Sequence, residues 1–227
     1  MHPSAQIYTK LVLKLYDFIV LSISNGYAWR CPTQTTLLPF SREHAGGEAH
    51  LDVGVGTGYY PANAVTHLAR TEEITFVDLN PDTLEVAESR LREAGYKGRI
   101  ETLEHDVFLP LPTSMHKRFD SVSLFYLLHC LPGSFPAKSA QVLHSLIPAM
   151  TDDATLYGAT ILGEGVEHNW LGQKLMDLYN AKGVFSNIRD SQDKLLASLK
   201  ERFEEVEIRL VGVVALFVAR QPIRRVE

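Results

Sequence analysis

The chain has 227 residues, a length that favours one sizeable domain over several. Its hydrophobic content of 45% and charged content of 22% are typical of a globular protein. A net charge of −5 argues against non-specific binding of nucleic acid and favours a small-molecule partner. We expect a monomer or a homodimer.

The N-terminal region and the cysteines carry no sign of membrane or metal binding. The apolar segment Leu11 to Ile23 is interrupted by Lys14 and Asp17, so it is too short to span a bilayer. Its leucines recur at the spacing of an amphipathic helix. Cys31 and Cys130 have no paired or C-x-x-C spacing, which favours free thiols in a reducing compartment. With no signal-peptide pattern, we expect a cytoplasmic protein with no membrane association.

The predicted elements follow a regular order. Residues 1–48 are predicted to form a helical cap, with two helices joined by Asn25-Gly26 and Cys31-Pro32, ahead of a main domain at 49–227. We predict strands at Ala49–Val53, Ile74–Asp78, Arg99–Glu104, Phe119–Phe125, Thr155–Ile161, Glu205–Val211 and Val213–Arg220. We predict helices at Tyr60–Ala69, Pro81–Ala94, Pro136–Met150, Asn169–Lys182 and Asp190–Arg202.

Alternating strands and helices predict an α/β fold with a Rossmann-like, mostly parallel sheet of seven strands, covered by helices on both faces. The last two strands are separated only by Gly212, so they must form an antiparallel hairpin.

Three glycines follow the first strand. Gly54, Gly56 and Gly58 stand at every second position, which predicts a tight turn whose backbone approaches a nucleotide-type ligand. A dinucleotide fingerprint needs G-x-G-x-x-G, but Tyr59 or Pro61 occupies the third glycine position, depending on where the count begins. A P-loop lysine is also missing. NAD, FAD and a P-loop nucleotide are therefore disfavoured.

The run Leu51-Asp52-Val53 followed by G-x-G-x-G resembles motif I of the class I S-adenosylmethionine (SAM) dependent methyltransferases. Together with Tyr126 to Gly133, it is similar to small stand-alone methyltransferases of microbial secondary metabolism. The closing hairpin agrees with that family. The resemblance implies SAM as methyl donor, S-adenosylhomocysteine as product, and a small natural product as acceptor, methylated at carbon, oxygen or nitrogen.

The second strand ends in Asp78, 20 residues after Gly58. A carboxylate at that point can accept hydrogen bonds from both ribose hydroxyls of a bound nucleoside. Leu79 and Asn80 follow it, and Asn80 is placed to cap the next helix. The alternative is a solvated loop carboxylate, and the spacing favours the ribose role.

The remaining cofactor residues are assigned through the resemblance. Asp106, after the third strand, would accept the adenine amino group, and Val107 or Phe108 would flank the ring. We place Asp52 within the glycine turn, where it would orient backbone amides or reach the methionine amino group through water. Phe125 and Tyr126, at the end of the fourth strand, complete the expected cofactor set.

The fourth strand leads into the segment where the transferred methyl group lies in this family. The acid or Asn followed by Pro-Pro-aromatic, which is typical of enzymes that methylate nucleobase amines or glutamine, is missing here. His129 is the candidate general base, because imidazole titrates near neutral pH. A structural role at a helix start is the alternative. Cys130 is expected to be a buried thiol.

Aromatic side chains are the candidates for acceptor binding. Large aromatics at the mouth of a site suit a flat, apolar acceptor, although several of them are expected to pack as core. The candidates are Tyr8, Tyr16, Tyr27, Trp29, Trp170 and Tyr179, with His129.

Three functions follow. The first is a SAM-dependent methyltransferase that acts on a small aromatic or polyketide-like metabolite. The second is a SAM-binding partner or regulatory protein of the same fold without activity of its own. The third, an NAD(P)-dependent oxidoreductase, is disfavoured by the glycine spacing.

Overall fold

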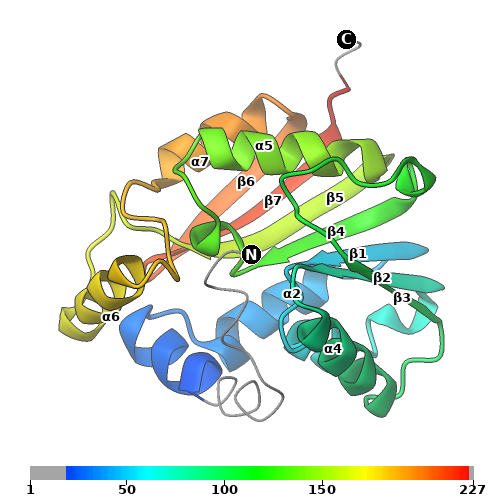
Figure 1. Ribbon diagram of the computed structural model, residues 1–227, viewed down its shortest axis with the longest axis horizontal. Coiled ribbons are helices and arrows are strands. Elements are labelled where there is room, and N and C mark those ends of the chain that lie inside the picture. Colours follow the sequence, from blue (N-terminus) through cyan, green and yellow to red (C-terminus); the bar gives the residue numbers. More distant parts are fainter. Residues whose placement is uncertain (1–18, 225–227) are drawn as a thin grey trace.

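The computed structural model describes residues 19–224, which form a twisted seven-stranded sheet with helices on both faces (Figure 1). The strand order is β3-β2-β1-β4-β5-β7-β6. The strands are β1 (Ala49–Val53), β2 (Glu73–Asp78), β3 (Arg99–Glu104), β4 (Phe119–Phe125), β5 (Met150–Ile161), β6 (Phe203–Val211) and β7 (Val214–Pro222).

Strands β1 to β5 pair in parallel, and β7 lies antiparallel between β5 and β6. Gly212 makes the turn of the β6–β7 hairpin with a φ of +60°, in the left-handed region that favours glycine. The predicted fold class and the antiparallel hairpin are confirmed. Strand β5 begins five residues earlier than predicted, at Met150, where the pairing with β4 is irregular.

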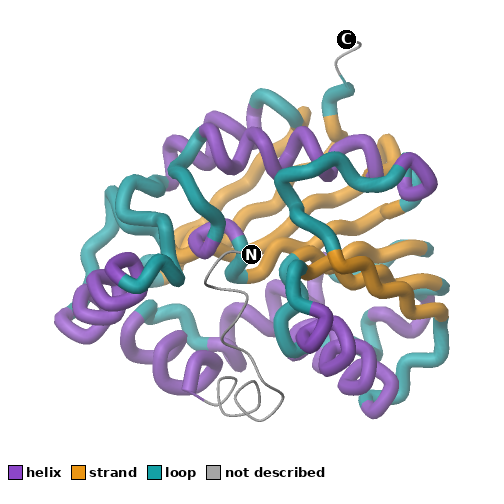
Figure 2. Tube along the Cα trace, viewed as in Figure 1, coloured by secondary structure: helices purple, strands orange, loops and turns teal. Residues whose placement is uncertain are grey.

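The helices lie in two layers. Helices α5 and α7 cover one face of the sheet, while α2 and α4 lie on the opposite side (Figures 1 and 2). The α-helices are α2 (Leu38–His44), α3 (Tyr59–Asn63), α4 (Pro81–Glu93), α5 (Ala137–Leu146), α6 (Trp170–Ala181) and α7 (Gln192–Lys200). Single turns and π-type segments are η2 (Ile19–Ala28), η3 (Thr33–Leu37), η4 (Leu68–Arg70), η5 (Thr113–Met115), η6 (Leu128–Cys130) and η7 (Ile147–Ala149).

Buried side chains form three clusters. The largest lies between the sheet and α5 and α7, and includes Phe119 and Phe203. The second joins the N-terminal segment to β4, β5 and β7 through Trp29 and Tyr157. The third packs α4 on β2 around Phe76. Each face of the sheet is therefore covered, as the apolar β-strand sequences require.

Three side chains fix where helices begin. Asn80 accepts from the N–H of Asp82 at the start of α4, as predicted. Asn169 and Ser191 cap α6 and α7 in the same way. Within residues 19–224, every helix falls short of the length and apolarity that a bilayer span demands.

Two predicted helical regions differ from the structure. Asn25-Gly26 does not interrupt the N-terminal helix, because η2 continues to Ala28 and the buried Asn25 donates to the Thr33 hydroxyl. The helix after the glycine turn is shorter than predicted and ends at Asn63. Side chains bind its main-chain carbonyl groups there. The Asn63 side-chain amide donates to the carbonyl of Tyr59, and the Arg42 guanidinium donates to the carbonyl of Asn63.

Candidate active site

The carboxyl ends of β1, β2 and β3 lie side by side, which brings three predicted segments together. Val53 pairs with Val77, and Asp78 pairs with Glu104. From β1 the chain adds β2 and β3 on one side, and from β4 it adds β5 on the other side. The strand order therefore reverses between β1 and β4, and open α/β sheets bind ligands at such a switch point.

The glycine turn combines tight packing with open space. Gly54, Gly56 and Gly58 have φ values of +71°, +54° and +69°. A Cβ on Gly58 would lie 2.7 Å from the Cα of Ala87 in α4, and a Cβ on Gly54 would lie 2.8 Å from the Leu127 side chain. At Gly56, no other described atom lies within 4 Å of that position, apart from its chain neighbours. The middle glycine therefore leaves room for a ligand against the backbone.

Asp78 is joined to the glycine turn. Its Oδ2 accepts from the N–H of Gly56 at 3.4 Å, and its Oδ1 accepts from the N–H of Asn80 at 3.0 Å. Burial raises the pKa of Asp78, and these backbone hydrogen bonds oppose the rise. The side chain is half-buried. The Asp78 carboxylate has more lone pairs than these two hydrogen bonds use, so it can also accept from ribose hydroxyls.

Asp52 lies within β1 and not in the glycine turn, where we had placed it. The turn begins only at Gly54, because the sheet pairing of β1 extends to Val53. Burial raises the pKa of Asp52 to about 7, a hydrogen bond with Ser123 lowers it, and the charge of Asp78 raises it further. A cation beside this carboxyl group would favour its charged form.

The adenine-side residues follow β2 and β3. Asp106 is half-buried, and its Oδ1 accepts from the N–H of Phe108 at 2.9 Å. Val107 is buried, whereas Leu79 leaves 41% of its surface exposed at the end of β2. The two strand ends are neighbours through the pairing of Asp78 with Glu104. The residues that follow the two strands, Leu79, Asp106 and Val107, therefore offer a carboxylate and apolar side chains near each other.

Aromatic side chains gather where β4 ends. Tyr126 turns the chain sharply with a φ of +56°, and its N–H donates to Ala159 in β5. Its hydroxyl is buried and has no hydrogen-bond partner among the residues that the structure describes. Burial raises its pKa well above the ordinary value. Phe125 stacks on Tyr60 of α3, with ring centroids 4.4 Å apart. The sequence reasoning missed Tyr60, which lies two residues after Gly58.

His129 is packed into the protein interior. Its Nδ1 accepts from the N–H of Ile161 at 3.4 Å, and its ring meets the edge of Phe185 at 4.5 Å. Burial, together with the charge of Lys138, lowers the pKa of His129 to about 3. A neutral, hydrogen-bonded imidazole of this kind is a poor proton acceptor near neutral pH. These contacts favour a structural role over that of a base.

The candidate acceptor aromatics fall into different environments. Trp29 is 2% exposed and packs against His168 and Phe185. Tyr27 and Trp170 are more than 70% exposed. Tyr179 is half-buried against Phe185. Tyr8 and Tyr16 lie outside the described residues. The buried Trp29 thus serves the core, as expected for part of this set.

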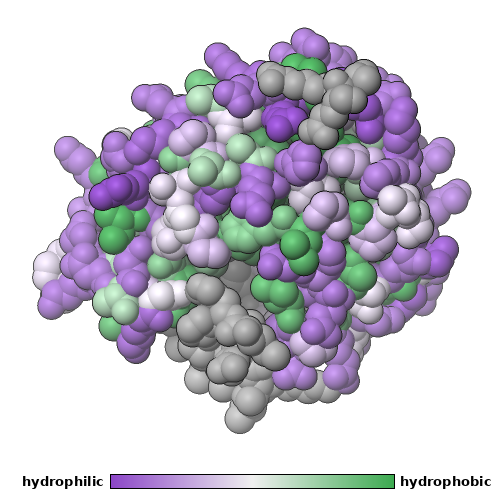
Figure 3. All heavy atoms as spheres, turned by 45° about the horizontal axis from the view of Figure 1, so that its top comes forward, coloured by the Kyte–Doolittle hydropathy of each residue, from purple (hydrophilic) through white to green (hydrophobic). Residues whose placement is uncertain are grey.

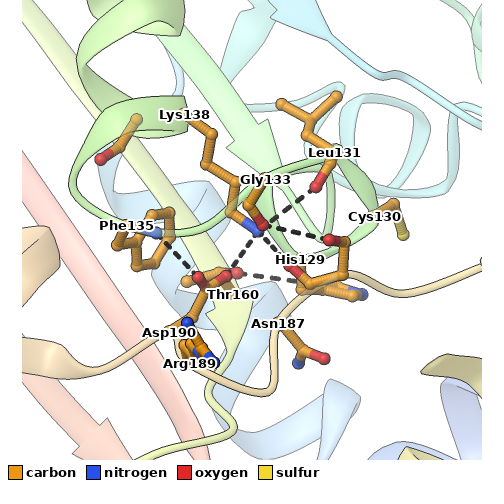
Figure 4. A network of polar contacts seen from close by, with 12 residues as sticks. His129, Cys130, Leu131, Gly133, Phe135, Lys138, Thr160, Asn187, Arg189 and Asp190 are labelled. Carbon is orange, nitrogen blue, oxygen red and sulfur yellow. Dashed lines mark hydrogen bonds and ion pairs between the residues drawn. The ribbon is translucent and has the colours of Figure 1, made fainter.

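A buried ion pair was missed entirely by the sequence reasoning. Lys138 and Asp190 approach within 2.6 Å, and both side chains are almost fully buried (Figure 4). A single lysine in an amphipathic helix reads as solvent-facing, so no sequence signal pointed to it. Among residues 19–224, no group of three or more His, Cys, Asp or Glu side chains gathers to hold a metal.

Comparison with known proteins identifies the family. Residues 51–148 match the family described as a methyltransferase domain. The methyltransferase verB of Penicillium polonicum is 42% identical over 233 aligned residues, which span 98% of this chain and 100% of that protein. The chain belongs to the SAM-dependent methyltransferases. SAM is therefore its cofactor, in agreement with the open glycine turn and the carboxylate beside it.

Other relatives also cover most of the methyltransferase. The physcion biosynthesis cluster O-methyltransferase of Aspergillus chevalieri is 42% identical, over 95% of this chain and 94% of that protein. The uncharacterized protein YbcY of Escherichia coli is 49% identical, over 88% of this chain and 98% of that protein.

Solved structures show the same fold at low sequence identity. The [4+2]-cyclase SpnF superposes with a TM-score of 0.63 at 16% identity, covering 99% of this chain and 98% of that chain. A SAM-dependent methyltransferase from Aquifex aeolicus superposes with a TM-score of 0.60 at 16% identity, covering 94% of this chain and 99% of that chain. These likenesses confirm the architecture of the methyltransferase.

Proposed function

We propose that this methyltransferase transfers the methyl group of SAM to an oxygen atom of a small aromatic or polyketide-like metabolite. The observation that carries the proposal is the contact between the glycine turn and the aromatic segment after β4. The space beside Gly54 is filled by Leu127, directly after Tyr126. A cofactor held at the turn would therefore present its methyl group close to these aromatic side chains.

The donor half is formed by β1, β2 and β3. In this proposal, Asp78 accepts from the ribose hydroxyls, Asp106 accepts from the adenine amino group, and the open backbone at Gly56 receives the methionyl portion. Asp52 supplies a negative charge near the positive end of the cofactor. SAM, when bound, supplies a methyl group that is already activated on a sulfonium sulfur.

The acceptor half is formed after β4. Phe125 and Tyr126, expected from the sequence to contact the cofactor, are assigned here with Tyr60 to the boundary between cofactor and acceptor. Their rings provide flat apolar surface, and the unpartnered Tyr126 hydroxyl provides one buried polar contact. Hydrophobic side chains also gather in a band on a surface that is otherwise mostly hydrophilic (Figure 3). The protein's task is to align the nucleophile and to exclude water.

The N-terminal helices belong to the same arrangement. We assign residues 1–48 as a cap on the domain at 49–227, because the described part packs on β5 and β7 through Trp29, Leu37 and Phe40. His129 holds the segment after β4 in place and does not take the proton. An acidic phenol or enol can instead lose its proton to bulk water before it enters the site and bind as the anion.

The relatives support oxygen as the acceptor atom. The relative from Aspergillus chevalieri and a second one from Aspergillus niger are named O-methyltransferases. The fold alone does not decide the reaction, since a fold neighbour is named a cyclase. The alternative of a SAM-binding partner without activity is therefore an outcome of the test.

The test is a panel assay with mass detection. The purified protein is incubated with SAM and, separately, with phenols, indoles and small amines. We expect a phenol to gain the mass of one methylene unit while S-adenosylhomocysteine accumulates. A product formed only from indoles or amines would contradict oxygen as the acceptor. Tight SAM binding with no product from any class would favour the binding-partner role.

A further inference from the structure

The ion pair of Lys138 and Asp190 joins segments that are far apart in the chain. Lys138 lies in the first turn of α5, and Asp190 immediately precedes α7. Their side chains are 1% and 0% exposed, with Nζ and Oδ2 2.6 Å apart. Figure 4 shows the lysine reaching across the loop after β4 toward Asp190.

Both partners also hold main-chain groups. Lys138 Nζ donates to the carbonyl of Leu131 at 3.3 Å and to that of Ser186 at 2.6 Å. Asp190 Oδ1 accepts from the N–H of Phe135 at 2.9 Å. The main-chain oxygen of Asp190 accepts from Gly163, at the exit of β5. The pair thus binds the loop after β4 to the segment before α7.

The segment before α7 in turn holds the loop that carries Tyr126 and His129. The N–H of Ser186 donates to the carbonyl of His129 at 2.8 Å, and the Ser186 hydroxyl donates to the carbonyl of Gly133 at 3.0 Å. The ring of Phe185 packs on His129, which meets Tyr126 with ring centroids 5.5 Å apart. Contacts therefore run from the ion pair to the proposed acceptor half without a gap.

Stability alone gives little reason for this pair. Burying two charges removes them from water, and apolar side chains of similar size often stabilise a core as well or better. Burial accordingly lowers the pKa of Lys138 and raises that of Asp190. What an apolar pair cannot supply is the directed bonds to Leu131, Ser186 and Phe135.

We propose that Lys138 and Asp190 are positioning residues, which set the loop of residues 126–136 in the place that aligns the acceptor with the methyl group. This inference rests on the proposed function. Gly54 touches this loop through Leu127, but Gly56, Gly58 and Asp78 are held by β1, β2 and α4, so the pair governs the acceptor half more than the donor half.

The test compares two variants with wild type. The double variant K138M/D190L removes both charges together, so neither is left buried without its partner, and it is expected to fold. The main-chain groups of Leu131, Ser186 and Phe135 lose the bonds that the pair supplies. The matched control is Glu164→Gln, which breaks the exposed ion pair of Lys194 with Glu164 nearby. Hydrogen exchange by mass spectrometry, calorimetry with S-adenosylhomocysteine, and turnover of a phenol that the wild type methylates are measured on each.

In the double variant we expect exchange of residues 126–136 to rise about tenfold, while residues 54–60 exchange as in wild type. Turnover should fall about a hundredfold, the scale of a misplaced reactant. Affinity for S-adenosylhomocysteine should stay within about twofold, because Asp78 and the glycine turn are untouched. The control should match wild type throughout.

Three results would overturn the proposal: unchanged exchange of residues 126–136, normal turnover despite faster exchange, or a uniform rise in exchange over the whole chain. If the wild type methylates no compound, the proposed function fails. The exchange and calorimetry arms then still decide whether the pair holds this loop independently of the donor half.

Discussion

The N–H of Gly56 faces Oδ2 of Asp78 across 3.4 Å, which joins the turn after β1 to the end of β2. This contact places a carboxylate beside the one glycine of the turn that has open space next to it. The proposed donor half is therefore a preformed unit of backbone and carboxylate, and a bound cofactor would meet both at once.

Replacing Asp78 by alanine should weaken SAM binding by about 1–3 kcal/mol, the scale of hydrogen bonds lost from a charged group. The measurement is calorimetry with SAM and S-adenosylhomocysteine. Asp82→Asn is the matched control, because Asp82 is exposed in the first turn of α4. Equal affinity in Asp78→Ala and wild type would remove Asp78 from the site.

Two glycines of the turn should respond differently to alanine. Gly58→Ala should lower the free energy of unfolding by about 3 kcal/mol, because left-handed strain adds to the clash with Ala87. Gly56→Ala should cost only about 1–2 kcal/mol, since its Cβ meets no described atom. It should nevertheless reduce SAM affinity about tenfold, because the methyl group fills space for the ligand.

The control for this pair is Gly183→Ala, at a φ of +67° with no described atom within 4 Å. It should show the same strain in denaturant unfolding and no change in SAM affinity. A Gly56→Ala variant that binds SAM normally would contradict the placement of the ligand.

Asp52 should make stability depend on pH. Burial raises its pKa from 3.8 to about 7, so its contribution to stability is complete below pH 3.8 and is lost as pH rises through about 7. Asp52→Asn should therefore raise the free energy of unfolding at pH 8 by about 2–4 kcal/mol. The gain should shrink toward pH 4 in denaturant titrations, and SAM affinity should fall with the lost charge.

His129 should affect stability more than catalysis. Its pKa is lowered to about 3, so its contribution to stability is complete above the unfolded value of 6.5 and is lost as pH falls toward about 3. Between pH 7 and 5, wild type should lose about 2 kcal/mol more than His129→Asn in denaturant unfolding.

The exposed His144 on α5 provides the control, and His144→Asn should follow wild type in the same titration. Turnover of His129→Asn should remain within about tenfold of wild type, whereas loss of a general base costs about a hundredfold or more. A loss of turnover of about a hundredfold or more in a folded His129→Asn variant would identify His129 as the base.

The sequence was most informative where backbone chemistry leaves a local signal. The glycines of the turn, the capping Asn80 and the hairpin at Gly212 each adopt the conformation that their residue types favour. Asp78 was placed correctly at a strand end because parallel strands share one edge. These signals sufficed for the fold and for the strand ends that form the proposed donor half.

The acceptor half was harder to predict because it depends on packing between distant segments. The sequence around His129 does not distinguish a ring that faces a substrate from one that packs on Phe185. Only the tertiary contacts show that the ring packs on Phe185. Lys138 and Asp190 are 52 residues apart, with no local pattern that joins them. Asp52 was placed in the turn although the strand predicted at Ala49–Val53 already contained it, and the pairing of β1 confirms that strand.

The most direct test of the account is mass detection of the product formed from SAM and a phenol by the wild-type protein. We predict a phenol that is heavier by one methylene unit, formed together with an equal amount of S-adenosylhomocysteine, and much less of both with Asp78→Ala at low SAM concentration. Tight SAM binding without any methylated product from the phenols would contradict it.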